Sequence, residues 1–254
     1  MGRPRTMALT SRNPNAIPAG PATAGASVEI WIVRLDVPPQ SASGATKFLS
    51  PEERTRADAF RNEQAHRNYV ISHAALRQIL ANHLKLNPAE IPFRNGSYGK
   101  PALAGSVAGR LEFNLTHSGS LALVALTTGA EVGVDVETVR PMPDALRIAE
   151  RFFSAAESDA LKELPVAEQA AAFLNLWTRK ESLAKATGFG IANSLARFAV
   201  TWGTQAAVTT IAGDTRQAAQ WSLHSFQPAP GYVAAVAIHS PSAQFAFHEF
   251  QMTA

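Results

Sequence analysis

The stretch LWTRKESLAKATG, residues 176–188, closes a long helical pattern. Apolar residues recur at helical spacing before it, and Gly188 stands where a helix C-cap glycine is expected. Trp177, Glu181 and Lys185 are spaced four residues apart, so they share one face of the predicted helix. Taken alone, Glu181 and Lys185 also fit an ordinary exposed ion pair worth about 0.3–0.5 kcal/mol, with Trp177 in the core.

A second segment, VGVDVE at residues 132–137, contributes two further carboxylates. On a strand, Asp135 and Glu137 point to one side and the three valines to the other. Two acids two residues apart on a strand repel each other, and a cation between them removes that cost. Together with Glu181 they provide three carboxylates, the oxygen ligands that suit magnesium.

The two segments together resemble the signature of the 4'-phosphopantetheinyl transferase superfamily. The similarity is closer to the longer, two-half (Sfp-like) type that activates peptide and polyketide synthases. The paired motif is specific, whereas either half alone would be weak. Further motifs follow in the family's order, over a resemblance of about residues 50–200: YGKP at 98–101, FNLTHS at 113–118 and FFSAAE at 152–157.

The resemblance implies an α+β fold made of two similar α/β halves related by a pseudo-twofold axis. The active site is then expected in the cleft between the halves, a common place for ligands. We expect a disordered tail over residues 1–27, an N-terminal half over 28–128 and a C-terminal half with the metal site over 129–254.

The activity implied is transfer of 4'-phosphopantetheine from coenzyme A to a serine of an apo acyl or peptidyl carrier protein, with release of adenosine 3',5'-bisphosphate. Magnesium would be held by Asp135, Glu137 and Glu181 and would bridge the pyrophosphate oxygens. Glu181 and Lys185 are the expected catalytic residues. The family's coenzyme A contacts carry over to these residues: Lys100, Pro101, Thr116, His117 and Lys185. Of these, Lys100 and His117 would serve the 3'-phosphate and adenosine end.

Two points of the site stay open in the sequence. Glu181 is expected to accept the serine proton either directly or through a water on the metal, and a metal ligand has a lowered proton affinity. The family also carries an arginine on its second helix that contacts a coenzyme A phosphate. Counting back from Arg77, the matching position is Asn68, so we assign that role to its neighbour Arg67. On an ideal helix this one-residue difference rotates the side chain by ~100°.

Composition limits the alternatives. The chain has 254 residues, no cysteine and no apolar run long enough for a membrane span. Its formal charge is +3, but Arg3, Arg5 and Arg12 precede the first acid, so the rest of the chain is formally neutral. There is no basic stripe with interleaved aromatic residues, which disfavours nucleic acid as a partner. We expect a cytoplasmic monomer without nucleic-acid or membrane partners.

The coarse secondary structure fits this reading. A strand is expected near residues 28–35, and Ser50 and Pro51 begin a helix with a cap and an acidic first turn. A second helix is expected over residues 63–84. It carries His66 and His73, which we interpret as surface or satisfied core residues because ~10 Å separates them along the helix. Thr116 and His117 are expected at a turn between strands. After Gly190 the chain resembles an antiparallel meander, over residues 198–202, 206–211, 220–226 and 232–238.

The segment from Met142 to Phe153 borders the expected site and mixes apolar residues with Arg140, Arg147 and Arg151. The resemblance places it near the surface that meets an acidic carrier protein. Met142 lies between two prolines and is the better candidate for exposure, whereas Phe153 is expected in the core.

Two other classes of function remain open at this level. One is a different magnesium-dependent enzyme acting on a nucleotide pyrophosphate, such as a hydrolase, which needs a positioned water but no protein acceptor. The other is a noncatalytic module that binds carrier proteins, against which the complete set of three acids argues. Detection of a phosphopantetheine group on an apo carrier protein distinguishes the transferase from both.

Overall fold

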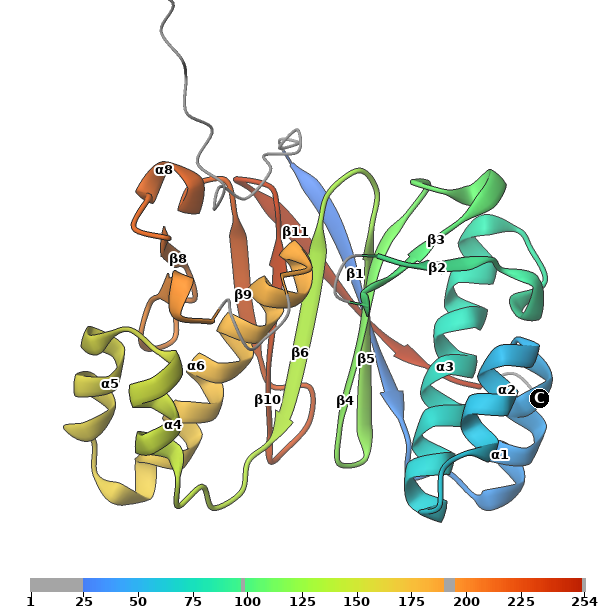
Figure 1. Cartoon of the computed structure of the whole chain (residues 1–254), viewed down its shortest axis with the longest axis horizontal. Coiled ribbons are helices and arrows are strands. Elements are labelled where there is room, and N and C mark those ends of the chain that lie inside the picture. Colours follow the sequence, from blue (N-terminus) through green and yellow to red (C-terminus); the bar gives the residue numbers. More distant parts are fainter. Residues whose placement is uncertain (1–24, 97–98, 190–194, 253–254) are drawn as a thin grey trace, which may run out of the picture.

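A computed structural model describes residues 25–96, 99–189 and 195–252. The expected tail, residues 1–27, lies almost entirely outside these ranges, as does Tyr98 of the YGKP motif. Strands stand in the middle of the molecule and helices cover both sides (Figure 1). Within the described ranges, no helix combines the length and apolar character that crossing a bilayer requires.

The first sheet has the strand order β11-β1-β5-β4. Its strands are β1 (Ala26–Arg34), β4 (Glu112–Ser118), β5 (Leu121–Thr127) and β11 (Ala243–Phe250). The helices on its side are α1 (Pro39–Ala45), α2 (Pro51–Asp58) and α3 (Glu63–Leu84). The apolar face of α3, including Leu76 and Leu80, packs against Phe113 of β4 and Val124 of β5. A small two-stranded sheet, β2 (Phe93–Asn95) with β3 (Pro101–Leu103), follows α3.

The second sheet has the order β6-β10-β9, with β6 (Val132–Thr138), β9 (Ser222–Phe226) and β10 (Tyr232–Ile238). The helices on its side are α4 (Ala145–Phe152), α5 (Ala155–Lys162), α6 (Val166–Thr187) and the short α8 (Thr215–Ala218). A separate hairpin pairs β7 (Phe198–Val200) with β8 (Val208–Ile211). Short 3₁₀ turns occupy Thr46–Phe48, Pro88–Glu90, Gly105–Val107 and Leu195–Arg197.

The helix boundaries follow the signals in the sequence. The Ser50 hydroxyl accepts from the Glu53 amide and the Glu53 carboxylate accepts from the Ser50 amide, which closes a capping box at the start of α2. Ser154 and Glu157 form the same box at α5. At its far end α6 stops at Gly188, whose φ of 70° is a left-handed conformation that glycine adopts without strain.

The two sheets pack against each other through the valine face of β6. Val132, Val134 and Val136 are buried with residues of β1 and β10, such as Ile30 and Val236. The alternate residues of β6 face the other way, toward α6, as the strand period requires. The expected separation of acids from valines on this strand is therefore confirmed.

The strand β6 is also held to β4, although the two are not paired through a backbone ladder. The buried Asn114 side chain of β4 accepts a hydrogen bond from the Val134 amide at 3.0 Å. On the opposite side, Gly133 brings the β6 backbone directly against the backbone of α6. A Cβ atom added at Gly133 would lie 2.1 Å from the Ser182 carbonyl oxygen and 2.3 Å from the Ala186 nitrogen.

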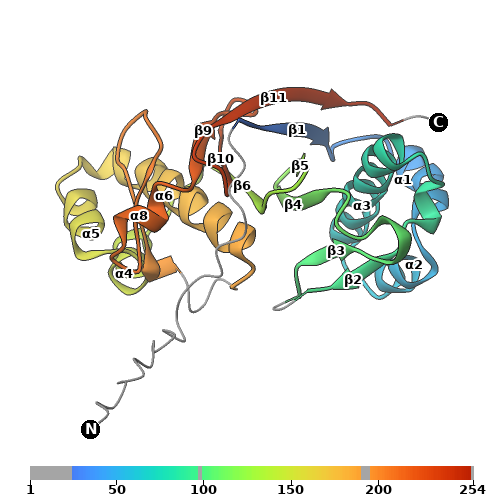
Figure 2. The ribbon, with the colours of Figure 1, turned by 90° about the horizontal axis from the view of Figure 1, so that it is seen from above.

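Two expectations about the chain's second part need correction. The predicted meander is not one sheet, because β7 and β8 pair only with each other whereas β9 joins β10 and β6. In addition, β11 belongs to residues 129–254, expected as the C-terminal half, but it lies parallel to β1 at the edge of the first sheet (Figure 2). The last strand of the chain therefore completes the sheet of the N-terminal part.

Candidate active site

One ammonium group joins the predicted site residues of β4, β6 and α6. Lys185 donates hydrogen bonds to the Asp135 carboxylate and to the Thr116 hydroxyl, the latter at 3.1 Å. Its Nζ also lies 3.4 Å from Oε2 of Glu181, one turn earlier on α6. The Thr116 hydroxyl in turn donates to Oδ1 of Asp135 at 3.1 Å. The residues predicted from the strand and helix patterns, Asp135 and Glu181, therefore meet at the ammonium group of Lys185.

This cluster is buried, which excludes the ordinary exposed ion pair. Asp135 is 3% exposed and Glu181 is 7% exposed. Trp177, one turn before Glu181 on the same helix, is partly buried and stacks on the buried Phe173. The charges of the cluster are therefore only weakly screened by solvent, and each carboxylate depends on the cation next to it.

The third predicted acid, Glu137, lies at the edge of this cluster. Its carboxylate accepts a hydrogen bond from the Ser118 hydroxyl at 3.0 Å and forms an ion pair with Arg140 at 3.3 Å. Among the described residues, no three His, Cys, Asp or Glu side chains converge as a ready-made metal site. Burial is the main cause that raises the pKa values of Asp135 and Glu181, and the charge of Glu137 adds to it.

One observation nevertheless fits a cation at this position. The Oδ2 atom of Asp135 is buried and has no hydrogen-bond partner among the described residues. A buried carboxylate oxygen without a partner is costly, and such atoms in native proteins are often completed by an ion or water. The donor set is all oxygen, from Asp135, Glu137 and Glu181, which is the type that magnesium prefers.

Burial sets the protonation of these groups. It raises the pKa of Glu181 to about 7, with a further contribution from the nearby Asp135 charge. Burial also raises the pKa of Asp135, against the effect of Lys185. Burial alone would lower the pKa of Lys185, but the carboxylates of Asp135 and Glu181 outweigh it and raise that pKa. Lys185 therefore stays charged, while Glu181 can exchange a proton near neutral pH.

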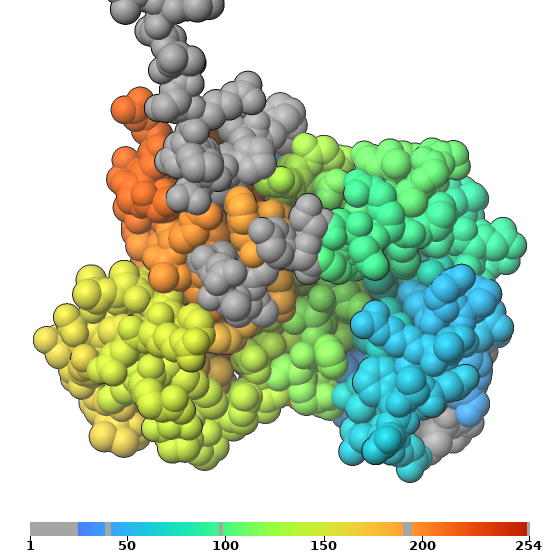
Figure 3. All heavy atoms as spheres, viewed as in Figure 1, coloured from blue at the N-terminus to red at the C-terminus, as the bar shows by residue number. Residues whose placement is uncertain are grey.

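A cavity of about 810 Å³ opens beside this cluster, on the side of α2 and α3. Its lining includes Pro101 and His117, two residues predicted for coenzyme A, and Gly99 of the same motif. Figure 3 shows a hollow between the yellow and the blue helices, over the green strands, whereas the cavity itself is lined only by residues between Ser50 and His117, on the blue and green side. The size fits a nucleotide-like ligand.

Strand β4 forms the wall between the cavity and the acid cluster. Its residues alternate: Thr116 and Ser118 contact the acids of β6, whereas Leu115 and His117 line the cavity. Thr116 and His117 were expected at a turn, but β4 continues to Ser118 before the chain reverses. Because neighbours on a strand face opposite sides, the two residues serve two compartments. A ligand that crosses the end of β4 can reach both.

Partial burial and the charge of Lys185 lower the pKa of His117, so the imidazole is neutral at neutral pH until an anion approaches. Three further side chains in the cavity were missed or interpreted differently from the sequence: Arg56, Tyr69 and His73. His73 stacks on Tyr69, with 3.8 Å between ring centroids. Their spacing of four residues on α3 was the available signal, but only the tertiary fold shows that this face of the helix lines a cavity.

Two predicted coenzyme A contacts lie elsewhere. Lys100 does not line this cavity, and its ammonium instead donates to two backbone carbonyls on the far side of the loop. Arg67 interacts within its own helix, with Gln64 at 3.4 Å and Glu63 at 4.0 Å. The neighbouring Asn68 donates to the Gly119 carbonyl oxygen at 3.3 Å. A ligand role for Arg67 stays a prediction.

Comparison with known proteins identifies the class to which this fold and site belong. Residues 131–237 match the family model of the 4'-phosphopantetheinyl transferase superfamily. Residues 38–129 match the model of the 4'-phosphopantetheinyl transferase N-terminal region. The chain belongs to the 4'-phosphopantetheinyl transferase superfamily and is an enzyme of that type. The resemblance inferred from the motifs is confirmed.

Individual relatives agree over most of the chain. The 4'-phosphopantetheinyl transferase HetI of Nostoc sp. is 35% identical over 212 residues, which is 83% of this chain and 87% of HetI. The 4'-phosphopantetheinyl transferase Sfp of Bacillus subtilis is 30% identical over 195 residues, covering 76% of this chain and 84% of Sfp. A 4'-phosphopantetheinyl transferase of Bacillus pumilus is 33% identical, covering 77% and 81% respectively.

Proposed function

We propose that this chain transfers 4'-phosphopantetheine from coenzyme A to a serine of an apo acyl or peptidyl carrier protein and releases adenosine 3',5'-bisphosphate. One observation carries the proposal: a buried Asp135–Lys185–Glu181 cluster lies one strand away from a nucleotide-sized cavity. Such a pair of sites suits a substrate with a nucleotide at one end and a pyrophosphate in its middle.

In this proposal the adenosine end with its 3'-phosphate occupies the cavity, near Pro101 and His117. The pyrophosphate crosses the end of β4, where Thr116 and Lys185 provide hydrogen-bond donors. Lys185 is held in place by its two carboxylate partners, so its positive charge is already oriented when the phosphates arrive. Preorganised charge of this kind is the main source of catalysis in phosphoryl transfer.

Asp135, Glu137 and Glu181 would hold a magnesium ion, for which the unpartnered Oδ2 atom of Asp135 offers a free ligand. When bound, the ion would neutralise the pyrophosphate and stabilise the leaving group. Glu181 has a second proposed task as the proton acceptor, directly or through a water: without a bound ion, burial raises its pKa to about 7. It takes the proton of the carrier serine as the serine oxygen bonds to the β-phosphorus. The bond from that phosphorus to the adenosine bisphosphate oxygen breaks.

We infer that the two sheets with their long helices are the two halves of the family architecture. The helices α3 and α6 have 22 residues each and cover the two sheets from opposite sides. The division is then residues 28–128 and 129–254, except that β11 is exchanged into the first half. A pseudo-twofold axis would pass between β4 and β6, next to the site.

The test is mass spectrometry of an apo carrier protein mixed with coenzyme A, magnesium and the enzyme. A gain of ~340 Da on the carrier, the mass of one phosphopantetheine group, indicates transfer by phosphoryl chemistry. A hydrolase would instead consume coenzyme A without modifying the carrier. A noncatalytic module would bind the carrier and change neither molecule.

His117→Ala is expected to raise the KM for coenzyme A more than the KM for 3'-dephospho-coenzyme A. The reason is a charge-assisted bond from the imidazole to the 3'-phosphate, worth about 1.5–3 kcal/mol. Because the pKa of His117 is lowered, the preference of the wild type for coenzyme A should grow as the pH falls and the ring becomes charged. Substrate titrations with both compounds at several pH values measure this. Equal losses on both would show that His117 does not read the 3'-phosphate.

The carrier surface is expected on the exposed side of α4. Met142 packs partly against the core, so its substitution would also affect stability. The Arg147 side chain is 74% exposed, and Arg151 is exposed one turn later. Arg147→Glu combined with Arg151→Glu should therefore raise the KM for an acidic carrier, at unchanged KM for coenzyme A, and the effect should shrink at high salt.

The matched control for this surface is the double variant Arg110→Glu and Arg216→Glu, which makes the same charge change at exposed residues outside α4. Steady-state kinetics with the carrier as varied substrate compare the two. If both double variants raise the carrier KM equally, the effect reflects net charge and the α4 surface is not the docking site.

A further inference from the structure

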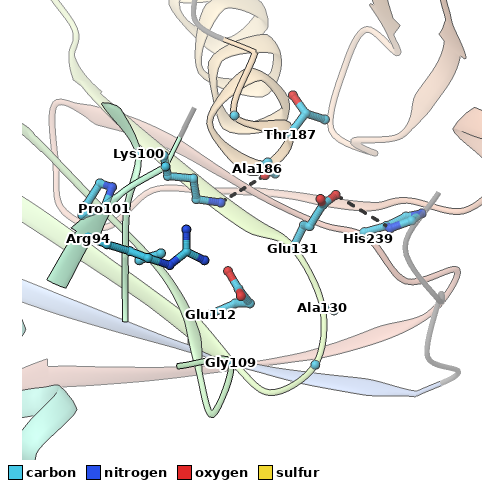
Figure 4. Close-up of a pocket in the computed structure, with 14 residues that line it drawn as sticks. Arg94, Lys100, Pro101, Gly109, Glu112, Ala130, Glu131, Ala186, Thr187 and His239 are labelled. Atoms are coloured by element: carbon cyan, nitrogen blue, oxygen red, sulfur yellow. Dashed lines mark hydrogen bonds and ion pairs between the residues drawn. The ribbon is translucent and has the colours of Figure 1, made fainter. Parts of the chain in front are cut away.

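Lys100 lies in the short connection between β2 and β3, directly after Gly99, whose φ is 82°. This connection has a cavity on each side. Gly99 and Pro101 line the nucleotide-sized cavity described above. The Lys100 side chain extends instead into a second cavity of about 440 Å³, between the loop and the end of α6 (Figure 4). Pro101 therefore borders both cavities, whereas the Lys100 side chain lines only the second.

The ammonium of Lys100 makes two hydrogen bonds to the other half of the molecule. It donates to the Val132 carbonyl oxygen at 3.0 Å and to the Ala186 carbonyl oxygen at 3.0 Å. Val132 begins β6, three residues before Asp135. Ala186 directly follows Lys185 in the last turn of α6. Carbonyls in the last turn of a helix lack partners within the helix and carry a partial negative charge, so a cation is favoured there.

The surroundings of Lys100 explain why it stays with these carbonyls. Burial lowers the pKa of Lys100, and the charges of Glu112 of β4 and Glu131 before β6 offset this only in part. In Figure 4 these acids lie across the cavity, while the lysine chain extends toward Ala186. An ammonium that left for a ligand in the nucleotide cavity would abandon two backbone partners at the junction of β6 and α6.

We propose that Lys100 is a positioning residue that ties the loop of the nucleotide cavity to the strand and helix of the acid cluster. The tie fixes the distance between Pro101 on the cavity wall and Asp135 and Lys185 beyond β4. A ligand that spans both places depends on that distance, whereas a ligand confined to the cavity does not. The inference rests on the proposed function for its kinetic consequence only, since the two hydrogen bonds exist without a substrate.

The kinetic test compares Lys100→Met with the wild type, using coenzyme A, 3'-dephospho-coenzyme A and the fragment adenosine 3',5'-bisphosphate. We expect kcat to fall about tenfold or more with both coenzymes by the same factor, because a small misplacement of reacting groups is costly. The Kd of the bisphosphate, which fills the cavity alone, should stay the same. A loss confined to coenzyme A would overturn the proposal, because it would make Lys100 a reader of the 3'-phosphate.

Chemical rescue separates the ammonium from general packing. Lys100→Ala removes the last three carbons and the nitrogen of the side chain, and added propylammonium should restore part of its kcat. Arg94→Met is the matched control, since Arg94 is an exposed cation that lines the same cavity. It should leave kcat unchanged. Equal losses in Arg94→Met and Lys100→Met would overturn the tie, because the loss would then follow from removing any positive charge at this cavity.

A second measurement does not depend on catalysis. Without ligands, hydrogen–deuterium exchange should become faster in Lys100→Met at residues 131–137 and 182–189, and stay the same in Arg94→Met. Unchanged exchange at these segments would overturn the tie whatever the kinetics show. If the wild type transfers no phosphopantetheine, the proposed function fails, and the exchange data alone then decide the role of Lys100.

Discussion

Asp135→Asn is expected to abolish phosphopantetheine transfer, with a loss of about 10³-fold or more in kcat. Asparagine keeps the shape of the side chain and removes the charge that both Lys185 and a bound magnesium ion need. Asparagine also removes the charge from the buried pair with Lys185, so the stability of the variant has to be measured beside its activity. Glu181→Gln should have an effect of similar size, because it removes both a ligand oxygen and the proposed proton acceptor.

The measurement is the rate of carrier modification across a magnesium titration, together with the melting temperature of each variant. Asp159→Asn is the control, since it neutralises an exposed acid that pairs with Lys162 far from the site. Removal of the Asp135 charge should also bring the pKa of Glu181 below 7, which NMR titration can follow. Near-normal turnover by a folded Asp135→Asn at low magnesium would disprove the assignment of the cluster.

Features encoded by neighbouring residues were predictable from the sequence. The cap at Ser50, the glycine stop at Gly188 and the length of α3 follow from side chains within a few residues of each boundary. The acids of β6 were assigned to one face because the period of a strand fixes it. Their meeting with Lys185 needed the family resemblance, because no spacing rule connects residues 50 positions apart.

Features that depend on distant parts of the chain were not predictable. The parallel pairing of β11 with β1 joins residues more than 200 positions apart, and neither strand contains a signal for the other. The direction in which the Lys100 side chain extends was not predictable for the same reason. Its motif indicates a loop near a ligand. The two carbonyls that accept its hydrogen bonds belong to β6 and α6, and they lie next to Lys100 only in the folded chain.

Gly133→Ala is expected to lower both stability and activity strongly, although the change adds one methyl group at a residue that makes no proposed ligand contact. The added Cβ would lie 2.1 Å from the Ser182 carbonyl and 2.3 Å from the Ala186 nitrogen, and both are backbone atoms that cannot rotate away. Helix α6 and strand β6 would have to separate. Overpacking of this kind costs about 1–3 kcal/mol of the free energy of unfolding.

The effect on activity should exceed the effect on folding, because the same displacement moves Glu181 and Lys185 of α6 away from Asp135 of β6. A displacement of about 1 Å can reduce kcat by about 10²-fold. Thermal melting gives the folded fraction. The kcat per folded molecule then measures the effect on activity alone. Gly44→Ala is the control, because Gly44 lies on an exposed helical position where a Cβ meets nothing within 4 Å. It should leave kcat intact. A folded Gly133→Ala enzyme with normal kcat would show that the close contact of β6 and α6 does not set the geometry of the acid cluster.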